Sequence, residues 1–323
     1  VSHEDEGQLS APDDALFRHR HRAARGQREA GAPEGATARR PISRQIDFHQ
    51  EAVRRRVGPP DFGDGRPLPA AAGGRTVAAH RVETHVNRLP DGDWAPAATL
   101  ALKDRHANPA GSERVLSEID RLAHLLRILC LGTGRRKRRF SDVVDAIRSG
   151  EAADPSHPVW NIPRDEVRNM GFHLKDLHKR NQKMCKLLLL RLNDELAGKI
   201  SGADPDRYTV EHVLPQRPPG SSEWRVWFPA SDERGRCTES LGNLVLVTQQ
   251  QNDKARNATF VEKKIIFRQG GDVLSITRAV LERPEWRAAD IEAREEQLFD
   301  LMRTLWRIDL PRAKAPDTAP KVA

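Results

Sequence analysis

The sequence has few of the features that mark secreted, membrane-embedded or zinc-braced proteins. Its 323 residues include 3 cysteines, and Cys130, Cys185 and Cys237 stand far apart, without the Cys-x-x-Cys pairs of a structural zinc site. Isolated cysteines suit a reducing cytosol. No stretch approaches the ~18 consecutive apolar residues of a membrane span, and the N-terminus has no apolar leader core. We therefore expect a cytoplasmic protein with no membrane partner and no structural zinc.

Charge is distributed in favour of the basic residues. Lysine and arginine outnumber aspartate and glutamate by 54 to 46, which gives a formal net charge of +8 and a pI near 9.7. A chain with this balance attracts polyanions, and such binding weakens as salt rises. The composition favours a nucleic-acid partner without identifying it.

Sustained apolar periodicity is missing from both ends of the chain. Residues 1–95 are rich in Arg, Ala, Gly, Pro and His, and they offer too little apolar surface to offset the entropy lost on ordering. Residues 313–323 are a short polar stretch that contains proline and lysine. We predict a largely disordered N-terminal arm over 1–95 and a disordered tail over 313–323.

Helical periodicity dominates the middle of the chain. Apolar residues recur at helical spacing from Val115 to Leu129, as on one face of an amphipathic helix. The stretch from Met184 to Leu196 is apolar nearly all round, which is typical of a buried helix. The pattern predicts a helical domain over residues 96–200.

A run of basic residues interrupts this helical region. Two interpretations are open: a solvated turn that complements a helix C-terminus, or a clamp that holds phosphates of a duplex without reading its bases. The candidate phosphate-binding residues are Arg135, Arg136, Lys137, Arg138 and Arg139, together with Lys254, Lys263 and Lys264 further along the chain.

Polar residues follow strand-like segments in the last third of the chain. The segment 208–210 alternates into the pair Glu211-His212, and Asn243 directly precedes the apolar run 244–247, so both segments read as strands. Asn252 comes next, and Thr259-Phe260-Val261-Glu262 has the pattern of a capping box that opens a helix. Strand, strand and helix around these polar residues predict a ββα-metal finger.

The polar residues have the chemistry of a nuclease that uses one metal ion. Imidazole is a proton acceptor near neutral pH, so His212 is the candidate general base. Glu211 and Asn252 offer oxygen atoms, which suit Mg²⁺ or Mn²⁺ better than zinc. The amide of Asn243 can orient a neighbouring ring or loop. The alternative is that the Glu-His pair is merely half-buried and that Gly-Asn forms a plain turn.

The same residues resemble a known family. Glu211 to Gln216, with the sequence EHVLPQ, is similar to the C-terminal HNH domain of GmrSD-type (type IV, modification-dependent) restriction endonucleases, which belong to the His-Me finger superfamily. The likeness covers roughly residues 100–308. It also includes Trp224, Trp227-Phe228-Pro229, Leu241 to Leu246, Asn252, Asn257, Phe260, Lys263-Lys264, Trp286, Ile291, Arg294 and Trp306.

The resemblance implies an activity and a set of roles. It implies cleavage of double-stranded DNA with Mg²⁺ (or Mn²⁺), in restriction of phage or other foreign, modified DNA in the bacterial cytoplasm. By this resemblance His212 is the catalytic base, Glu211 and Asn252 hold the metal, and Asn243 orients the site. We therefore expect an α+β chain in which an HNH nuclease domain over 201–312, with a C-terminal helix, is embedded in helices.

One domain that is typical of this family has no counterpart in the sequence. Such proteins have an N-terminal half with a ParB/sulfiredoxin-like nucleotide-binding domain, and its acidic-Gly-Gln-Arg motif is absent here. Two alternatives to an autonomous nuclease follow from this departure. The chain could be a catalytically idle DNA-binding remnant, or a nuclease subunit that needs a separate nucleotide-binding partner.

Overall fold

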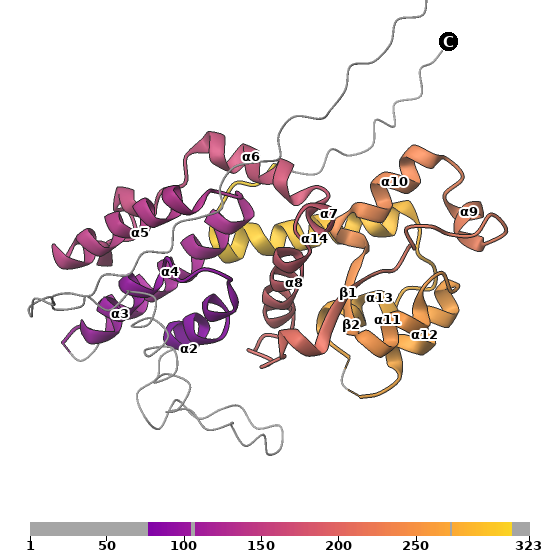
Figure 1. The fold of residues 1–323 in the computed structure, drawn as a ribbon, viewed down its shortest axis with the longest axis horizontal. Helices are drawn as coiled ribbons and strands as arrows, with labels where there is room; N and C mark the ends of the chain where they lie inside the picture. Colours follow the sequence, from indigo (N-terminus) through magenta and orange to yellow (C-terminus); the bar gives the residue numbers. More distant parts are fainter. Residues whose placement is uncertain (1–76, 105–106, 272, 312–323) are drawn as a thin grey trace, which may run out of the picture. The chain divides into compact units, whose positions relative to one another are not determined.

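The computed structural model describes residues 77–104, 107–271 and 273–311, and these are mostly helical (Figure 1). Within them, strand β1 (Tyr208–His212) pairs antiparallel with β2 (Leu244–Thr248) in a two-stranded sheet. A mostly helical chain with one small sheet is compatible with the predicted α+β class.

Helices make up the first part of the described chain. The two longest predicted segments are confirmed: residues 115–129 fall largely in α4, and residues 184–196 fall in α8. The helices in order are α2 (Val77–Thr84), η1 (Val86–Arg88), α3 (Ala95–Lys103), α4 (Pro109–Ile128), α5 (Thr133–Arg148), η3 (Glu151–Ala153), η4 (Pro158–Trp160), α6 (Arg164–Leu174), α7 (Leu177–Arg180) and α8 (Gln182–Leu196).

Side-chain caps define where α4 and α8 begin. Asn108 accepts a hydrogen bond from Gly111 N, and Asn181 accepts one from Met184 N, so each satisfies a backbone donor that the first helical turn leaves free. Between these starts and their ends, both helices carry apolar side chains into one core. The capped, largely buried α8 contacts both strands of the sheet.

The predicted boundary of the N-terminal arm at residue 95 is wrong. Residues 77–84 form α2, which packs against α4. Val82 and Val86 are buried, as is Trp94, whose indole donates to Asp91 O. The sequence misled because these helices are short and alanine-rich, and short helices depend on tertiary packing rather than on their own periodicity. The rest of the predicted arm, and the predicted tail, lie outside the described residues.

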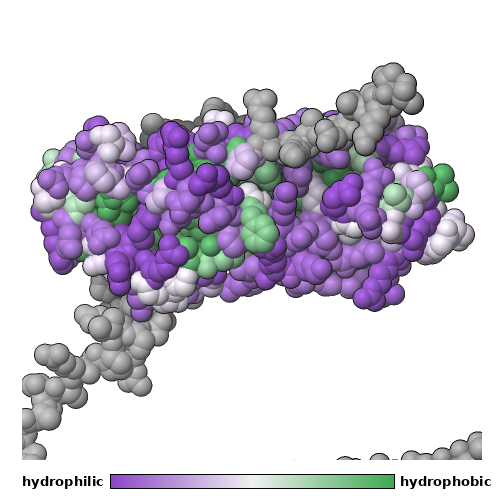
Figure 2. Space-filling view, turned by 90° about the horizontal axis from the view of Figure 1, so that it is seen from above, coloured by the Kyte–Doolittle hydropathy of each residue, from purple (hydrophilic) through white to green (hydrophobic). Residues whose placement is uncertain are grey.

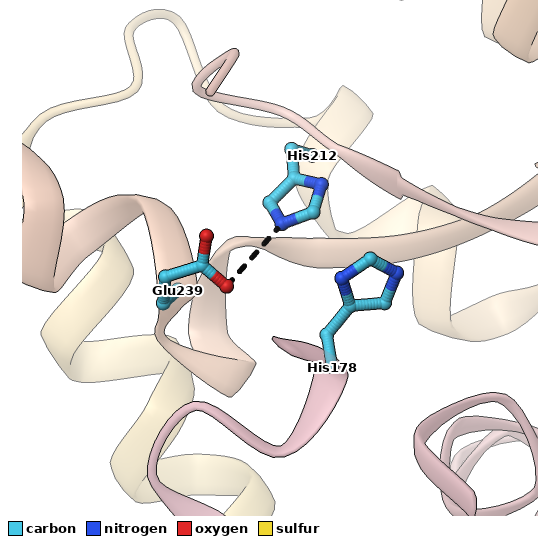
Figure 3. Close-up of side chains that lie close together, drawn as sticks. All are labelled: His178, His212 and Glu239. Atoms are coloured by element: carbon cyan, nitrogen blue, oxygen red, sulfur yellow. Dashed lines mark ion pairs between the residues drawn. The ribbon is translucent and has the colours of Figure 1, made fainter. Parts of the chain in front are cut away.

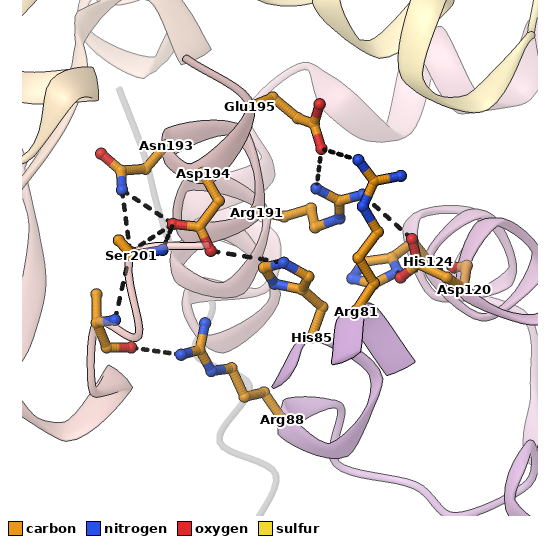
Figure 4. Close-up of polar contacts among 11 residues, drawn as sticks. Arg81, His85, Arg88, Asp120, His124, Arg191, Asn193, Asp194, Glu195 and Ser201 are labelled. Atoms are coloured by element: carbon orange, nitrogen blue, oxygen red, sulfur yellow. Dashed lines mark hydrogen bonds and ion pairs between the residues drawn. The ribbon is translucent and has the colours of Figure 1, made fainter. Parts of the chain in front are cut away.

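Buried polar contacts join His85, the residue before η1, to α8 and join α8 to α4 (Figure 4). His85 Nε2 lies 3.5 Å from Asp194 Oδ2, and Arg191 Nη2 donates to Asp120 Oδ2 at 3.2 Å. Burial, with the nearby Arg191 charge, lowers the pKa of His85 to about 2. The imidazole is therefore neutral in the folded chain, and the charges around it are carried by the arginine and the carboxylates.

The second part of the described chain surrounds the sheet. Helices α11 and α12 each begin with a capping box, Thr248 with Gln251 and Thr259 with Glu262. The second box is the one predicted from the sequence, although α11 already follows β2 directly. The elements around the strands are η5 (Pro205–Arg207), α9 (Glu223–Trp227), α10 (Ser231–Glu239), η6 (Leu241–Asn243), α11 (Gln249–Ala255), α12 (Phe260–Arg268), α13 (Ser275–Leu281) and α14 (Ala288–Trp306).

The register of the two strands decides which way the polar residues of β1 point. Glu211 is opposite Val245, and His212 is opposite Leu244. Because successive side chains of a strand alternate between faces, Glu211 and His212 occupy opposite faces of the sheet. Val245 packs in an apolar cluster that includes Trp286, whereas Leu244 packs in the core shared with α4 and α8.

The exposed surface is mainly hydrophilic. Figure 2 shows one face of the molecule, on which hydrophobic residues are scattered among hydrophilic ones. Large apolar side chains that reach the surface are Leu102, Phe172, Leu196, Val226, Val261 and Ile265. In the described ranges, no helix combines the length and the apolar character that a membrane crossing requires.

Candidate active site

The predicted base His212 lies at the end of β1, in contact with side chains from two other elements (Figure 3). Its ring packs edge-on against that of His178, with centroids 4.7 Å apart. Its Nε2 atom lies 3.9 Å from Glu239 Oε2 and 3.4 Å from Gln216 Nε2. The imidazole is mostly buried, with 9% of its side chain exposed.

His178 and Glu239 are residues that the sequence analysis missed. His178 lies on the single-turn helix α7, and Glu239 is the last residue of α10. Burial and the facing imidazole of His212 lower the pKa of His178. The His212 side chain, opposed by partial burial, lowers the pKa of Glu239. No spacing in the sequence links these two residues to His212, because only the packing of α7 and α10 brings them there.

The predicted metal ligand Glu211 is on the other face of the sheet. Its Oε1 atom accepts a 2.6 Å hydrogen bond from Lys263 Nζ, and the same ammonium group donates to His212 O at 2.6 Å. Lys263 is fully buried, and this burial lowers its pKa although the Glu211 charge opposes the shift. Lys263 therefore holds the carboxylate and the strand end in place, and the prediction that it binds phosphate is wrong.

Asn243 is a clamp for the loop after His212. Its Oδ1 accepts from Leu214 N at 2.7 Å and from Trp286 Nε1 at 3.0 Å, while its Nδ2 donates to Leu214 O and Thr238 O, both at 3.0 Å. The side chain is fully buried, and its amide makes two hydrogen bonds through the oxygen and two through the nitrogen. It thus orients the backbone that follows the histidine, and its hydrogen bonds go to Leu214, Thr238 and Trp286.

The preceding glycine explains why Gly-Asn is more than a turn signal. A Cβ atom on Gly242 would lie 2.1 Å from Ile291 O and 2.9 Å from Glu295 N on α14. Only glycine permits this approach of two backbones. Arg294 strengthens the contact by donating to Gly242 O and, at 2.9 Å, to Ile276 O. Helix α14 therefore fixes η6, which carries Asn243.

The second predicted metal ligand, Asn252, is half-buried on α11 against the strand that carries Glu211. Its Nδ2 donates to Val210 O at 3.2 Å. Neither Asn252 Oδ1 nor Glu211 Oε2 accepts a hydrogen bond from any residue that the structure describes. These are one carboxylate and one amide oxygen, the kind of donor that Mg²⁺ and Mn²⁺ prefer, so the donor set fits a hard divalent cation.

A basic cleft is lined in part by Gln216 and Glu239, whose side chains lie near His212 Nε2. Its volume is about 620 Å³, and it lies between α7, the loop after β1, and helices α9 and α10. The acidic residues on its wall are Asp176 and Glu239, and the cationic residues are Lys179, Arg217, Arg225, Arg234 and Arg236. Of these cations, Arg225 and Arg234 donate to backbone carbonyls. The described residues give no hydrogen-bond or carboxylate partner to the side chains of the other three.

The basic run 135–139 lies on helix α5 and is therefore not a turn. Its residues also differ in burial and pairing, so they do not form one uniform phosphate clamp. Arg136 is buried and pairs with Asp91 and Asp93, both at 2.8 Å. For Arg136 a phosphate-binding role is therefore excluded. Arg135 and Arg139 are both paired with Glu166.

The remaining candidates of the set are more accessible. Lys137, Arg138 and Lys254 are exposed, and each can reach a phosphate from outside the molecule. Lys264 donates to Arg283 O at 2.7 Å and lies over the Phe260 ring, with Nζ 5.2 Å from its centroid. Its ammonium group is thus partly used within the fold.

Comparison with known proteins finds a family match for the part of the chain that holds this site. Residues 162–301 match the family model described as GmrSD restriction endonucleases, C-terminal domain. That range includes β1, β2, the histidine pair, the basic cleft and most of α14. No curated protein matches the chain. Residues 162–301 of this chain are therefore similar to the C-terminal domain of GmrSD restriction endonucleases.

Proposed function

We propose that this protein is a metal-dependent DNA endonuclease of the HNH, or His-Me finger, type that acts in restriction of phage or other foreign DNA. The observation that carries the proposal is the position of His212. It ends β1, its Nε2 atom lies near Gln216 and Glu239, which line a basic cleft, and Asn243 clamps the loop that follows it. Strands β1 and β2 followed by α11 supply the ββα order of such a finger.

In this proposal His212 removes the proton from the attacking water. A base must be held in one orientation, and the contacts with His178 and Glu239 restrict the ring. The clamp by Asn243 and the bond from Lys263 to His212 O restrict the backbone on either side. A fixed base lowers the entropy that the reaction must lose at the transition state.

Glu211 and Asn252 are the proposed ligands of Mg²⁺ or Mn²⁺. Their oxygen atoms Oε2 and Oδ1 provide the hard donors, and Lys263 fixes the carboxylate through its other oxygen. Glu211 is adjacent to His212 at the end of β1, so a phosphate at this strand end would have to reach both faces of the sheet to contact the metal and the base. When bound, such a cation polarises a phosphate oxygen and neutralises the charge that develops in hydrolysis. Two protein ligands leave positions for water and phosphate, as is usual for Mg²⁺.

The basic cleft is the proposed path of the DNA backbone. Lys179, Arg217 and Arg236 line it without a carboxylate partner from the described chain. Unpaired cations release bound counterions from DNA when they contact phosphates, which makes affinity depend on salt. This cleft replaces most of the basic run on α5 as the main phosphate-binding surface.

A plasmid-cleavage assay tests the proposal. We expect the purified full chain to nick or linearise supercoiled DNA with Mg²⁺ or Mn²⁺, and to lose this activity when a chelator is added. Binding should weaken, with a smaller salt dependence, when Arg217 and Arg236 are replaced by glutamine. The matched control is Arg148→Gln, because the Arg148 side chain is exposed on α5 and lies outside the cleft. If the chain binds DNA in a salt-dependent way but does not cut it, even with a nucleotide-binding partner added, the nuclease proposal is refuted. The alternative that remains is a catalytically idle DNA-binding remnant.

A further inference from the structure

The cluster around His212 has the composition of a second, different metal site. His178, His212 and Glu239 each offer one ligand atom, and these atoms all lie within 4.8 Å of one another. They come from α7, β1 and α10, and Figure 3 shows the three side chains directed toward one another. Neither Glu211 nor Asn252 belongs to this cluster, and Glu211 lies on the opposite face of the sheet.

Two atoms of the cluster are buried without a hydrogen bond. Nδ1 of His178 and Oε2 of Glu239 have no such partner among the described residues. The 3.9 Å separation between Glu239 Oε2 and His212 Nε2 is too long for a hydrogen bond. Buried polar atoms almost always have partners, so unsatisfied atoms that face one another call for an explanation. A bound cation would satisfy both of them.

The donors select the kind of cation. Two imidazole nitrogens and one carboxylate oxygen are the ligand set of Zn²⁺ and related transition-metal ions rather than of Mg²⁺. In a tetrahedral zinc site, bonds of about 2.0–2.1 Å place neighbouring ligand atoms about 3.4 Å apart. The observed separations are 3.9 Å between His212 Nε2 and Glu239 Oε2 and at most 4.8 Å within the set, so metal binding requires the side chains to move closer together. A fourth position remains for water.

We propose that His178, His212 and Glu239 bind a transition-metal cation of the Zn²⁺ class, and that this cation inhibits hydrolysis by occupying the imidazole of His212. The inhibition rests on the proposed role of His212, whereas the binding does not. Neutral imidazole has one lone pair on nitrogen. A metal on that lone pair leaves the other nitrogen as an N–H donor, so the ring can no longer take a proton from water.

Calorimetric titration of the metal-free full chain with Zn²⁺ tests the binding. We expect His178→Ala to remove one equivalent of tight binding, with an affinity loss of at least about tenfold, and Glu239→Gln to weaken the same equivalent. His157→Ala is the matched control, because His157 also lies near a glutamate, with Nε2 3.5 Å from Glu151 Oε2. Histidines elsewhere add the same background in every variant.

Folding of each variant is checked by its melting temperature without metal, and His178→Gln replaces the alanine variant if that one is unfolded. Zinc binding by the folded His178 variants that equals binding by the wild type would overturn the site. So would an equal loss in the His157→Ala control.

Zinc titration of Mg²⁺-dependent cleavage tests the inhibition, with each variant compared with its own zinc-free rate. We expect wild type and His157→Ala to be inhibited by the zinc concentration that fills the site, and the His178 variant to resist it. Activation by zinc, or equal inhibition of all three proteins, would overturn the inhibitory role. A wild type that binds zinc but cuts no DNA, even with a nucleotide-binding partner added, would refute the proposed nuclease and leave the metal site standing.

Discussion

The buried ion pair between Lys263 and Glu211 gives a sharp test of how the sheet is held. The Lys263 ammonium is fully buried, lies 2.6 Å from Glu211 Oε1, and also donates to His212 O. Replacing it with methionine keeps most of the side-chain volume but leaves a buried carboxylate and a buried carbonyl without their donor. Breaking a buried pair from one side costs about 3–5 kcal/mol.

That magnitude sets the expected result. A loss of this size corresponds to a fall in melting temperature of roughly 6–20 °C, since each kcal/mol shifts a domain of this size class by about 2–4 °C. Denaturant unfolding of Lys263→Met gives the free energy directly. The control is Lys254→Met, since Lys254 is exposed and has no side-chain partner within the described residues, and its effect should stay within about 0.5 kcal/mol.

A double variant separates the ion pair from simple loss of packing. Adding Glu211→Leu to Lys263→Met removes the unpaired charge, and replacing both members of a buried pair is often neutral. We therefore expect the double variant to regain at least half of the lost stability. A single variant that loses less than about 1 kcal/mol, or a double variant less stable than the single one, would refute the reasoning.

Three further predictions concern other parts of the fold. Because the pKa of His85 is lowered to about 2, the unfolded chain alone binds its proton as pH falls below about 6.5, and stability should drop by up to about 1.4 kcal/mol per pH unit. In His85→Gln this dependence of the unfolding free energy on pH should flatten. Urea unfolding at several pH values measures it, and a slope equal to that of the wild type would contradict the prediction. Chains that begin at residue 96 should melt below chains that begin at residue 77, since α2 packs on α4; equal melting temperatures would contradict this. Finally, Gly242→Ala should destabilise by more than about 1 kcal/mol, because its Cβ would strike Ile291 O, and a neutral effect in thermal unfolding would show that the helix gives way.

Local signals predicted the parts of the fold that depend on neighbouring residues. Long apolar repeats gave α4 and α8, and a capping box gave the start of α12 at Thr259. Alternation into His212 and the apolar run after Asn243 gave the two strands. Each of these patterns lies within one element, where periodicity and capping chemistry act directly.

The arrangement of the site depends on contacts that no local pattern encodes. Lys263 looked like a surface cation among other basic residues, yet it is buried by its pairing with Glu211. His178 and Glu239 are single polar residues on short helices, and only tertiary packing places them beside His212. Sequence reasoning therefore found the proposed base, and it did not find the side chains that contact its ring.

The role of His212 is tested most directly by the rate at which the full chain nicks plasmid DNA with saturating Mg²⁺. His212→Ala should lower this rate by about 10²–10⁴-fold, which is the usual contribution of a general base, while DNA affinity and melting temperature stay near those of the wild type. His157→Ala, which removes a histidine outside the cluster, should cut at the wild-type rate. A His212→Ala protein that nicks DNA as fast as that control would contradict the assignment of His212 as the base.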